Sequence, residues 1–427
     1  MTTFITVWAG QLVSTLGSAL TTFAVGVWVY ETTGSATQFS ITLLASSIAS
    51  VGLAPLAGVI ADRWDRRLVM ILSDTGAALS SVFVLAMLLT GNLKVWHIYL
   101  TAFSNSACRS FQWPAYAATT SLLIPKEHLG RASGIAQIGH AVGQLAAPAI
   151  AGALFVTSGL RTILVIDVAT YLVALATLVA VRFPKPVATE EGQRIESSIW
   201  KEALFGWTYI RQRAGLLGLL VTYAFLNLFL CITLALYTPL ILGITTPDIL
   251  GYLNSVGGLG MLVGTLLMSA WGGPKRRILG IYAGETVIGI TTLLLGLPLS
   301  VPLMAMSRFF SLMAMPVSGG CNHAIWQSKV RPDIQGRVFA TQGMIIDAGV
   351  PLAYLVAGPL AERVFGPGMA AGGPLVRLFG PLVGVGPGRG IGLIFVIAGA
   401  LNVLISLAVL VYPRIRRVEL ELPDAVT

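Results

Sequence analysis

Long apolar runs recur along the chain and limit what it can fold into. Read with loose ends, there are twelve, at residues 4–30, 37–61, 68–90, 95–122, 131–157, 161–182, 214–243, 248–271, 278–298, 301–327, 338–364 and 390–412. A helix of about 20 residues crosses a hydrocarbon core about 30 Å thick. The runs are apolar on every side, which favours helices over barrel strands that alternate with period two. With 55% hydrophobic and 11% charged residues, the chain is predicted to be an all-α membrane protein with twelve transmembrane helices.

Positive charge is concentrated in alternate loops. Of the 27 Lys and Arg residues, only five lie in the predicted outer loops: Lys94, Arg161, Arg363, Arg377 and Arg389. Positively charged loops stay in the cytoplasm, so we expect both termini there, in a multi-pass protein of the cell inner (plasma) membrane. Anionic lipids attract such loops, which accounts for the net charge of +9 without a nucleic-acid partner.

One long polar segment divides the runs six and six. We therefore predict an N-terminal six-helix bundle at residues 1–182, a cytoplasmic linker at 183–213 whose amphipathic end lies on the membrane face, and a C-terminal six-helix bundle at 214–427. The halves also resemble each other, because Gly130-Arg131 and Gly336-Arg337 precede corresponding runs. Two parallel six-helix repeats are typical of secondary transporters.

The loop between the second and third runs carries the clearest motif, GVIADRWDRR. It resembles the signature loop of the major facilitator superfamily, Gly-x-x-x-Asp-Arg-x-Gly-Arg-Arg, through Gly58, Asp62, Arg63, Arg66 and Arg67. Asp65 replaces the usual glycine, and Asp tolerates left-handed backbone angles. The resemblance implies the two-bundle major facilitator fold and a cytoplasmic gate in which Asp62 contacts the eleventh helix. Simple anchoring to the inner leaflet remains an alternative for Arg66 and Arg67.

The fifth run resembles the antiporter motif of the same family. The matching positions are Gly134, Gly143, Ala147-Pro148 and Ala151-Gly152, with two alanines in place of glycines. We expect this seam to pack on a small face of the eighth run, formed by Gly257, Gly258, Gly260 and Gly264. The resemblance implies export in exchange for protons; packing without a mechanistic role is the alternative. VWVYETTGSA with DRWDRR further resembles the branch of macrolide and enterobactin exporters, which implies an amphiphilic organic substrate.

Polar residues in lipid-immersed helices face protein or water, so helical stripes of them predict a cavity lining. The predicted lining residues are Gln11 and Ser18 on the first run, Asn105 and Gln112 on the fourth, Gln137 and Gln144 on the fifth, and Asn227 on the seventh. Single members are also explained by hydrogen bonds between helices.

Ionisable groups inside the hydrocarbon suggest function. By depth, Asp347 and Arg109 rank first as proton-coupling candidates, ahead of Glu285 and Asp74, with Asp167 also two turns deep. Arg109-x-x-Gln112 partly resembles another family motif proposed to act in proton transfer. A permanent buried ion pair is the alternative.

Enzymatic signatures are absent from the sequence. There is no Gly-x-x-x-x-Gly-Lys-Ser/Thr phosphate loop, the four histidines lack ligand spacing, and the glycine-rich stretch after the eleventh run reads as a flexible outer loop. We expect no enzyme, cofactor or metal.

The predicted function is a secondary active transporter, a proton-coupled antiporter that exports drug-, macrolide- or siderophore-type molecules as a monomer. Its partners are membrane lipids, the small-molecule substrate and protons. A nutrient importer or uniporter, or a non-transporting membrane receptor, remain alternatives.

Overall fold

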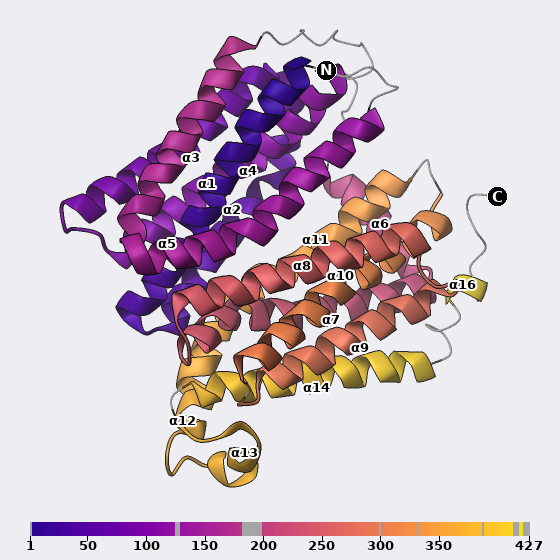
Figure 1. Cartoon of the computed structure of the whole chain (residues 1–427). Helices are drawn as coiled ribbons and strands as arrows, with labels where there is room; N and C mark the ends of the chain where they lie inside the picture. Colours follow the sequence, from indigo (N-terminus) through magenta and orange to yellow (C-terminus); the bar gives the residue numbers. More distant parts are fainter. Residues whose placement is uncertain are drawn as a thin grey trace. The chain divides into compact units, whose positions relative to one another are not determined.

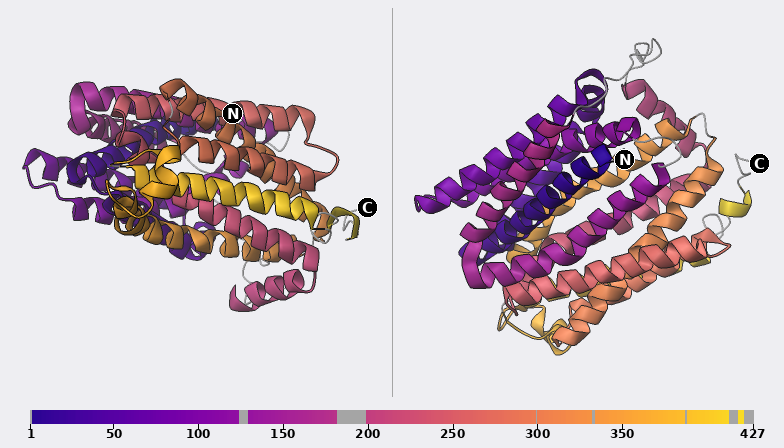
Figure 2. Two further views of the ribbon diagram at one scale, coloured as in Figure 1. Left: turned by 90° about the horizontal axis from the view of Figure 1, so that it is seen from below. Right: turned by 45° about the horizontal axis from the view of Figure 1, so that its top comes forward.

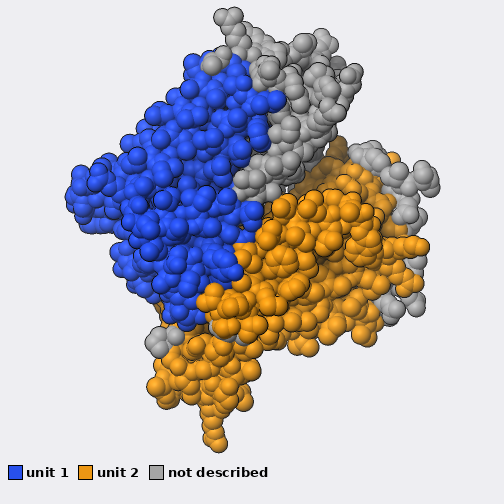
Figure 3. Space-filling model, in the orientation of Figure 1, with its two compact units in different colours: residues 1–188, 241–255 blue, residues 189–240, 256–427 orange. Residues whose placement is uncertain are grey.

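The computed structural model describes residues 2–123, 129–181, 199–298, 300–331, 334–386, 388–412 and 418–421, and all regular elements within them are helices (Figure 1). The chain forms two compact units, residues 1–188 with 241–255, and residues 189–240 with 256–427 (Figure 3). The structure thus assigns the start of the predicted eighth run to the first unit. The linker at 183–213 stays a prediction, since most of it lies outside the described residues.

Unit 1 contains α1 (Thr2–Thr33), α2 (Ala36–Arg63), α3 (Arg66–Leu89), α4 (Val95–Leu123) and α5 (Leu129–Ala180), with the first part of α8 (Pro247–Trp271). Gly159 interrupts α5 with φ 71° and ψ 177°, angles that favour glycine. The two segments of α5 correspond to the predicted fifth and sixth runs.

Helix α1 packs against both segments of α5. Its Leu20 and Ala24 share a buried core with Ala147 and Ala151 of the first segment. On the second segment, Gly10 faces Thr177 and Gly17 faces Thr170, so higher numbers on α1 meet lower numbers on α5. The two segments therefore run in opposite directions along α1, as expected for consecutive membrane helices. The glycines on α1 permit the close approach, because a Cβ at Gly17 would lie 3.1 Å from Asp167 Oδ1.

Unit 2 contains the remaining helices. They are α6 (Ile199–Arg211), α7 (Ala214–Leu242), the rest of α8, α9 (Arg277–Leu295), α10 (Val301–Lys329), α11 (Gln335–Pro359), a π-helix (Leu360–Phe365), α12 (Gly366–Met369), α13 (Val376–Val383), α14 (Arg389–Val411) and α16 (Val418–Glu421). α9 packs between α10 and α14, and Figure 2 shows α14, in yellow, running toward the C-terminus. Small residues line the α9–α14 contact, where a Cβ at Gly399 would lie 2.5 Å from the carbonyl oxygen of Gly289.

One prediction about unit 2 needs correction. The glycine-rich stretch is not a flexible loop: it follows a π-helix and contains two short helices, and Met369 and Val383 are fully buried against Leu393 of α14. Helix α6 packs against α11, since a Cβ at its buried Gly206 would be 2.8 Å from the Arg337 carbonyl oxygen. Its location on the membrane face stays a prediction. Burial of apolar surface therefore holds these segments against the neighbouring helices.

Ten helices of the described residues are long and apolar enough to cross a membrane. The prediction was twelve. Helix α4 is not among the ten because polar residues interrupt it, and α5 counts once although Gly159 divides it. The count of twelve and the location of the termini therefore stay predictions.

Candidate functional site: buried acids among the helices

Asp74 of α3 lies at the centre of a buried polar cluster in unit 1. Its side chain is 4% exposed. Gln11 of α1 donates from Nε2 to Asp74 Oδ2 at 2.8 Å, and Gln112 of α4 donates to Asp74 Oδ1 and, at 2.9 Å, to Gln11 Oε1. A carboxylate removed from water needs such donors, and two amides from neighbouring helices supply them. The structure therefore brings together three residues predicted as separate candidates.

A second buried acid, Asp167, lies on the second segment of α5. It is 4% exposed. Ser18 donates to Asp167 Oδ1 at 3.1 Å, and Ser81 donates to Oδ2 at 2.6 Å. Ser18 follows Gln11 by seven residues on α1, as Ser81 follows Asp74 on α3. The two acid sites are thus stacked about two helical turns apart, roughly 10 Å.

Sequence reasoning noted the depth of Asp167 but did not select it as a candidate. The sequence signal that could have identified Asp167 was a seven-residue spacing of polar residues on two runs, Gln11 to Ser18 and Asp74 to Ser81. That spacing places polar residues on one helix face, but it does not say which other helix faces them.

Arg109 of α4 belongs to both acid sites. Its guanidinium interacts electrostatically with the carboxylates of Asp167 and Asp74. Helices α3 and α4 approach closely here, because a Cβ at Gly76 would lie 2.6 Å from Cys108 Sγ, next to Arg109. Arg109 is also exposed. Unit 1 therefore combines two buried carboxylates with one guanidinium that interacts with both of them.

Glu285 of α9 is the buried acid of unit 2, at 7% exposed. Ser318 of α10 donates to Glu285 Oε1 at 2.7 Å, and the Asn402 side chain of α14 also hydrogen-bonds this carboxylate. One turn away on α9, the hydroxyl of Tyr282 pairs with that of Thr222 of α7 at 2.7 Å. The contacts of Glu285 come from uncharged side chains and join three helices.

The remaining candidates of unit 2 and α4 are more open. Asp347 of α11, ranked first by depth, has an exposed side chain. Asn227 of α7 donates to the Ile346 carbonyl oxygen at 3.3 Å, so it joins α7 to α11, and Asn105 of α4 is half-buried. In the described part of the chain, no group of three or more His, Cys, Asp or Glu side chains is placed to hold a metal ion.

Several predicted site residues have side chains outside the described residues, so the structure neither supports nor opposes their roles. They are Gly58, Asp62, Arg63, Arg66, Gly134, Gln137 and Gln144.

The described part of the signature loop shows why Asp65 replaces glycine. Asp65 is the N-cap of α3, with φ −59°, and its Oδ1 accepts from the backbone N–H of Arg67 at 2.9 Å and of Leu68 at 3.4 Å. The residue caps a helix and does not adopt a left-handed turn. The Arg67 guanidinium donates to the carbonyl oxygens of Leu178 and Val179, at 3.0 and 2.8 Å. Arg67 thus ties α3 to the end of α5, in addition to any contact with lipid.

The antiporter-like seam of α5 lies against the first part of α8, within unit 1. A Cβ at Gly152 would lie 2.6 Å from the Pro247 carbonyl oxygen. Ser255 Oγ accepts from the Ala149 N–H at 3.1 Å, beside Pro148, which lies inside the helix and has no backbone N–H to donate. The predicted contact between the fifth and eighth runs therefore exists.

The glycines chosen for the α8 side of that contact were wrong. Gly257, Gly260 and Gly264 face α10, where a Cβ at Gly257 would lie 2.7 Å from Leu312 Cδ1. Gly251, earlier on the same helix, is the residue that faces Pro148 and Gly152. Glycines on one helix contact two different neighbouring helices. Their spacing in the sequence does not show which glycine contacts which helix.

Helices of this length and apolar character, with buried polar clusters between them, are typical of a multi-pass membrane protein. The sequence profile of the Major Facilitator Superfamily matches residues 7–354, and the chain belongs to that superfamily. The resemblance inferred from the loop and the fifth run is confirmed, and so is the conclusion that the chain belongs to transporters and not to enzymes. It is a multi-pass cell membrane protein.

Relatives of this chain include efflux proteins. Macrolide efflux protein A of Streptococcus pyogenes is 30% identical over 372 residues, which cover 84% of this chain and 90% of the relative. The protein of the same description from Enterococcus faecalis is 30% identical over 330 residues, 75% of this chain and 99% of the relative. The multidrug efflux pump Tap of Mycobacterium bovis is 25% identical over 367 residues, 82% and 85% of the two chains.

Solved structures share the fold at low identity. A point mutant of the nucleoside transporter NupG has a TM-score of 0.74 and 15% identity, over 95% of this chain and 98% of its own. A bacterial homolog of the human lysosomal transporter Spinster has a TM-score of 0.71 and 14% identity, over 98% and 97%. At this identity they support the fold alone.

Proposed function

We propose that this chain is a proton-coupled antiporter that exports amphiphilic organic molecules, with macrolide antibiotics as the first substrate class to test. The observation that carries the proposal is the similarity over most of both chains to macrolide efflux protein A, at 30% identity. Export of an antibiotic would give the host cell resistance to it. The proposal includes twelve spans, cytoplasmic termini, alternating access and function as a monomer.

Proton coupling is supported by the buried acids. A carboxyl group inside a membrane protein can take up a proton when open to one side and release it to the other. Among the four candidates, Asp74 has the strongest support, because it is buried, held by two amides and close to Arg109. Asp347 and Glu285 are the next candidates. In this proposal Gln11 and Gln112 orient the Asp74 carboxylate.

The test uses the full-length protein in proteoliposomes with a radiolabelled macrolide. We expect exchange of internal for external macrolide without a pH gradient, and accumulation against its own gradient when a pH gradient is imposed. Asp74→Asn should abolish accumulation and leave exchange within about twofold. Parallel Asp347→Asn and Glu285→Gln variants show which acid matters. Absence of macrolide exchange by the wild-type protein would disprove the substrate assignment, and exchange with no response to a pH gradient would disprove proton coupling.

The same experiment distinguishes the proposed exporter from the two alternatives, a nutrient importer and a receptor. An importer would accumulate substrate with the opposite dependence on the pH gradient. A receptor would bind macrolide without exchange. The similarity to efflux proteins in both halves of the chain favours export.

A further inference from the structure

The two carboxylates of unit 1 and Arg109 form one electrostatic cluster. Asp74 and Asp167 are both buried, and both interact with the Arg109 guanidinium. With both acids ionised, the three groups carry one net negative charge; with one proton on either acid, they are neutral. A low-dielectric surrounding penalises the net charge. One proton on either of the two acids therefore removes the net charge of the cluster.

Hydroxyl groups occupy the helix turns between the two sites. Tyr171 lies one turn from Asp167 on α5, and its hydroxyl pairs at 2.7 Å with that of Thr75, the residue after Asp74. Thr75 donates its own proton to the Ile71 carbonyl oxygen, so Tyr171 is the donor of the pair. On α1, Ser14 is buried midway between Gln11 and Ser18. The two acid sites lie roughly 10 Å apart, which is too far for direct proton transfer between them. The hydroxyl groups divide this distance into shorter steps.

We propose that Asp167 is a second proton-carrying residue, which exchanges a proton with Asp74 along the α1–α3–α5 seam while Arg109 balances the charge. This deepens the proposed function and rests on it. On the predicted topology, Asp167 is the outer site and Asp74 the inner one. A proton from external water binds an Asp167 carboxylate oxygen. It leaves Asp167 as an equivalent proton binds Asp74, and Asp74 then releases a proton to internal water. No electrons are transferred, and one proton enters for each proton released.

Within the described residues, few charged and titratable groups lie around the two acids. Arg109 faces both acids from α4. Cys108 of α4 interacts with Asp74, and Tyr171 of α5 lies between the sites. Gln11, Ser18 and Ser81 are neutral donors to the carboxylates. Within the described residues, the carboxylates of the cluster are those of Asp74 and Asp167.

The experiment compares Asp167→Asn, Asp74→Asn and the control Glu31→Gln, whose acid lies exposed at the far end of α1. Each full-length protein is placed in proteoliposomes containing a pH-sensitive dye, with a radiolabelled macrolide as substrate. We expect each Asn variant to lose at least tenfold in gradient-driven accumulation and in macrolide-dependent proton movement, and to retain exchange within about twofold. Glu31→Gln should match the wild-type protein in all three measurements. Asp167→Glu should restore coupling.

Each outcome separates the two proposals. If the wild-type protein does not exchange macrolide, the proposed function fails and this inference fails with it. If the wild-type protein accumulates macrolide and Asp167→Asn does so equally well, the inference is wrong and the proposed function stands. If Asp167→Asn does not fold, Ser81→Ala takes its place, because it keeps the acid and removes one donor. We expect it to shift the pH midpoint of accumulation by about half a unit, and an unchanged midpoint would overturn the inference.

Discussion

The N-termini of α3 and α9 are capped in two different ways. The first turn of each helix contains an Arg followed by an apolar residue, and in both helices these two backbone N–H groups bind a carboxylate. For α3 the carboxylate is Asp65, the residue directly before the helix. For α9 it is Glu419, whose Oε1 and Oε2 accept from Arg277 N at 2.9 Å and Ile278 N at 3.1 Å, across more than 140 residues. In the second half, Arg276 is the N-cap of α9, and it has no carboxylate to offer.

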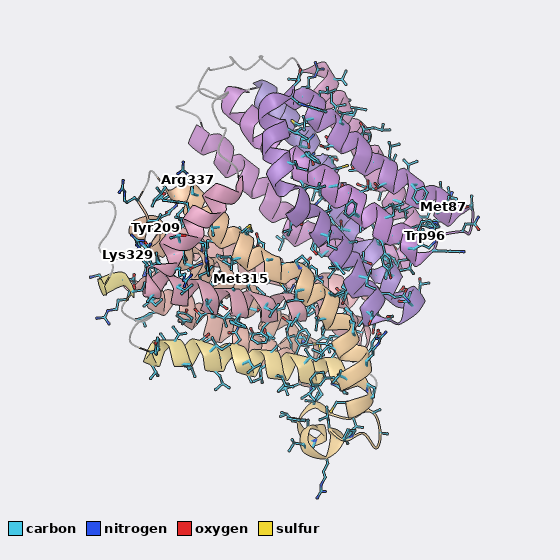
Figure 4. All side chains as sticks on the ribbon, turned by 180° about the vertical axis from the view of Figure 1, so that it is seen from behind. Met87, Trp96, Tyr209, Met315, Lys329 and Arg337 are labelled. Atoms are coloured by element: carbon cyan, nitrogen blue, oxygen red, sulfur yellow. The ribbon has the colours of Figure 1, made fainter. Side chains whose placement is uncertain are left out.

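The contact with Glu419 is part of a larger attachment of the C-terminal tail to unit 2. Val418 is fully buried in the core cluster of α7, α9 and α10, against Gly215. Lys329, at the end of α10, donates from Nζ to the Glu419 carbonyl oxygen at 2.6 Å. Figure 4 shows Lys329 at the same end of unit 2 as Tyr209 and Arg337. The start of α3 is therefore capped by the residue directly before it, whereas the cap of α9 depends on the C-terminal tail. Four predictions test this difference.

The largest effect is expected from Val418→Asp. It places a carboxylate in a fully buried apolar site and removes the packing against Gly215, so the free energy of unfolding should fall by about 3 kcal/mol or more. The measurement is thermal unfolding of the detergent-purified protein. The control Val385→Asp changes a half-exposed residue after α13 and should alter stability by about 0.5 kcal/mol or less. Equal effects of the two substitutions would show that the tail is not part of the core.

Glu419→Ala should lower the free energy of unfolding by about 1–2 kcal/mol, because it leaves two N–H groups at the positive end of α9 without an acceptor. Hydrogen exchange should become faster at the first turn of α9 and stay unchanged at α3. Glu419→Gln keeps one acceptor oxygen, so its free energy of unfolding should lie between those of the wild-type protein and Glu419→Ala. Faster exchange at both helices would contradict the separation of the two caps.

Asp65→Ala should cost about 1 kcal/mol, the usual value for an N-cap. Here the faster exchange is expected at the first turn of α3, with α9 unaffected. The effect is smaller than for Glu419→Ala because Arg67 still holds α3 to the Leu178 and Val179 carbonyl oxygens. A loss of several kcal/mol would indicate that Asp65 has a role beyond the cap.

Arg276→Asp should transplant the local cap into the second half, because Arg276 is the N-cap of α9. In a Glu419→Ala background it should recover about 0.5–1 kcal/mol, whereas in the wild-type protein, where α9 is already capped, it should add little. The four proteins form a double-mutant cycle on thermal unfolding. Additive effects of the two substitutions would mean that the introduced carboxylate and Glu419 do not compete for the same N–H groups.

The buried acids extend the comparison from the caps into the membrane helices. Asp74 on α3 and Glu285 on α9 follow the helix starts at nearly the same distance, and each accepts from the following helix, through Gln112 or Ser318. Their surroundings differ, since Asp74 has Arg109 beside it while neutral groups surround Glu285 in its described contacts. Acids at similar positions in the two halves thus belong to a cluster with an arginine in one half and to a junction of three helices in the other.

Several features of this protein were determined by its sequence alone. Apolar runs as long as a bilayer is thick leave helices as the solution, because backbone groups in lipid must be satisfied within the segment. The loop containing Asp62 and the spacing of Gly143, Pro148 and Gly152 were sufficient to identify the superfamily, which the profile over residues 7–354 confirms. Polar stripes on α1 and α4 contain Gln11 and Gln112, which the structure joins by a hydrogen bond, and their role as cavity lining stays a prediction.

Other features were decided only by the tertiary structure. Depth along a helix ranked Asp347 above Asp74, yet the first is exposed and the second is buried. Spacing on one helix gives a face but not the neighbour that covers it, so the partners of Asp167, the role of Gly251 and the cap from Glu419 were not predictable. Each is a contact between segments far apart in the chain. Which distant groups meet depends on how the helices pack against one another, and no local pattern encodes it.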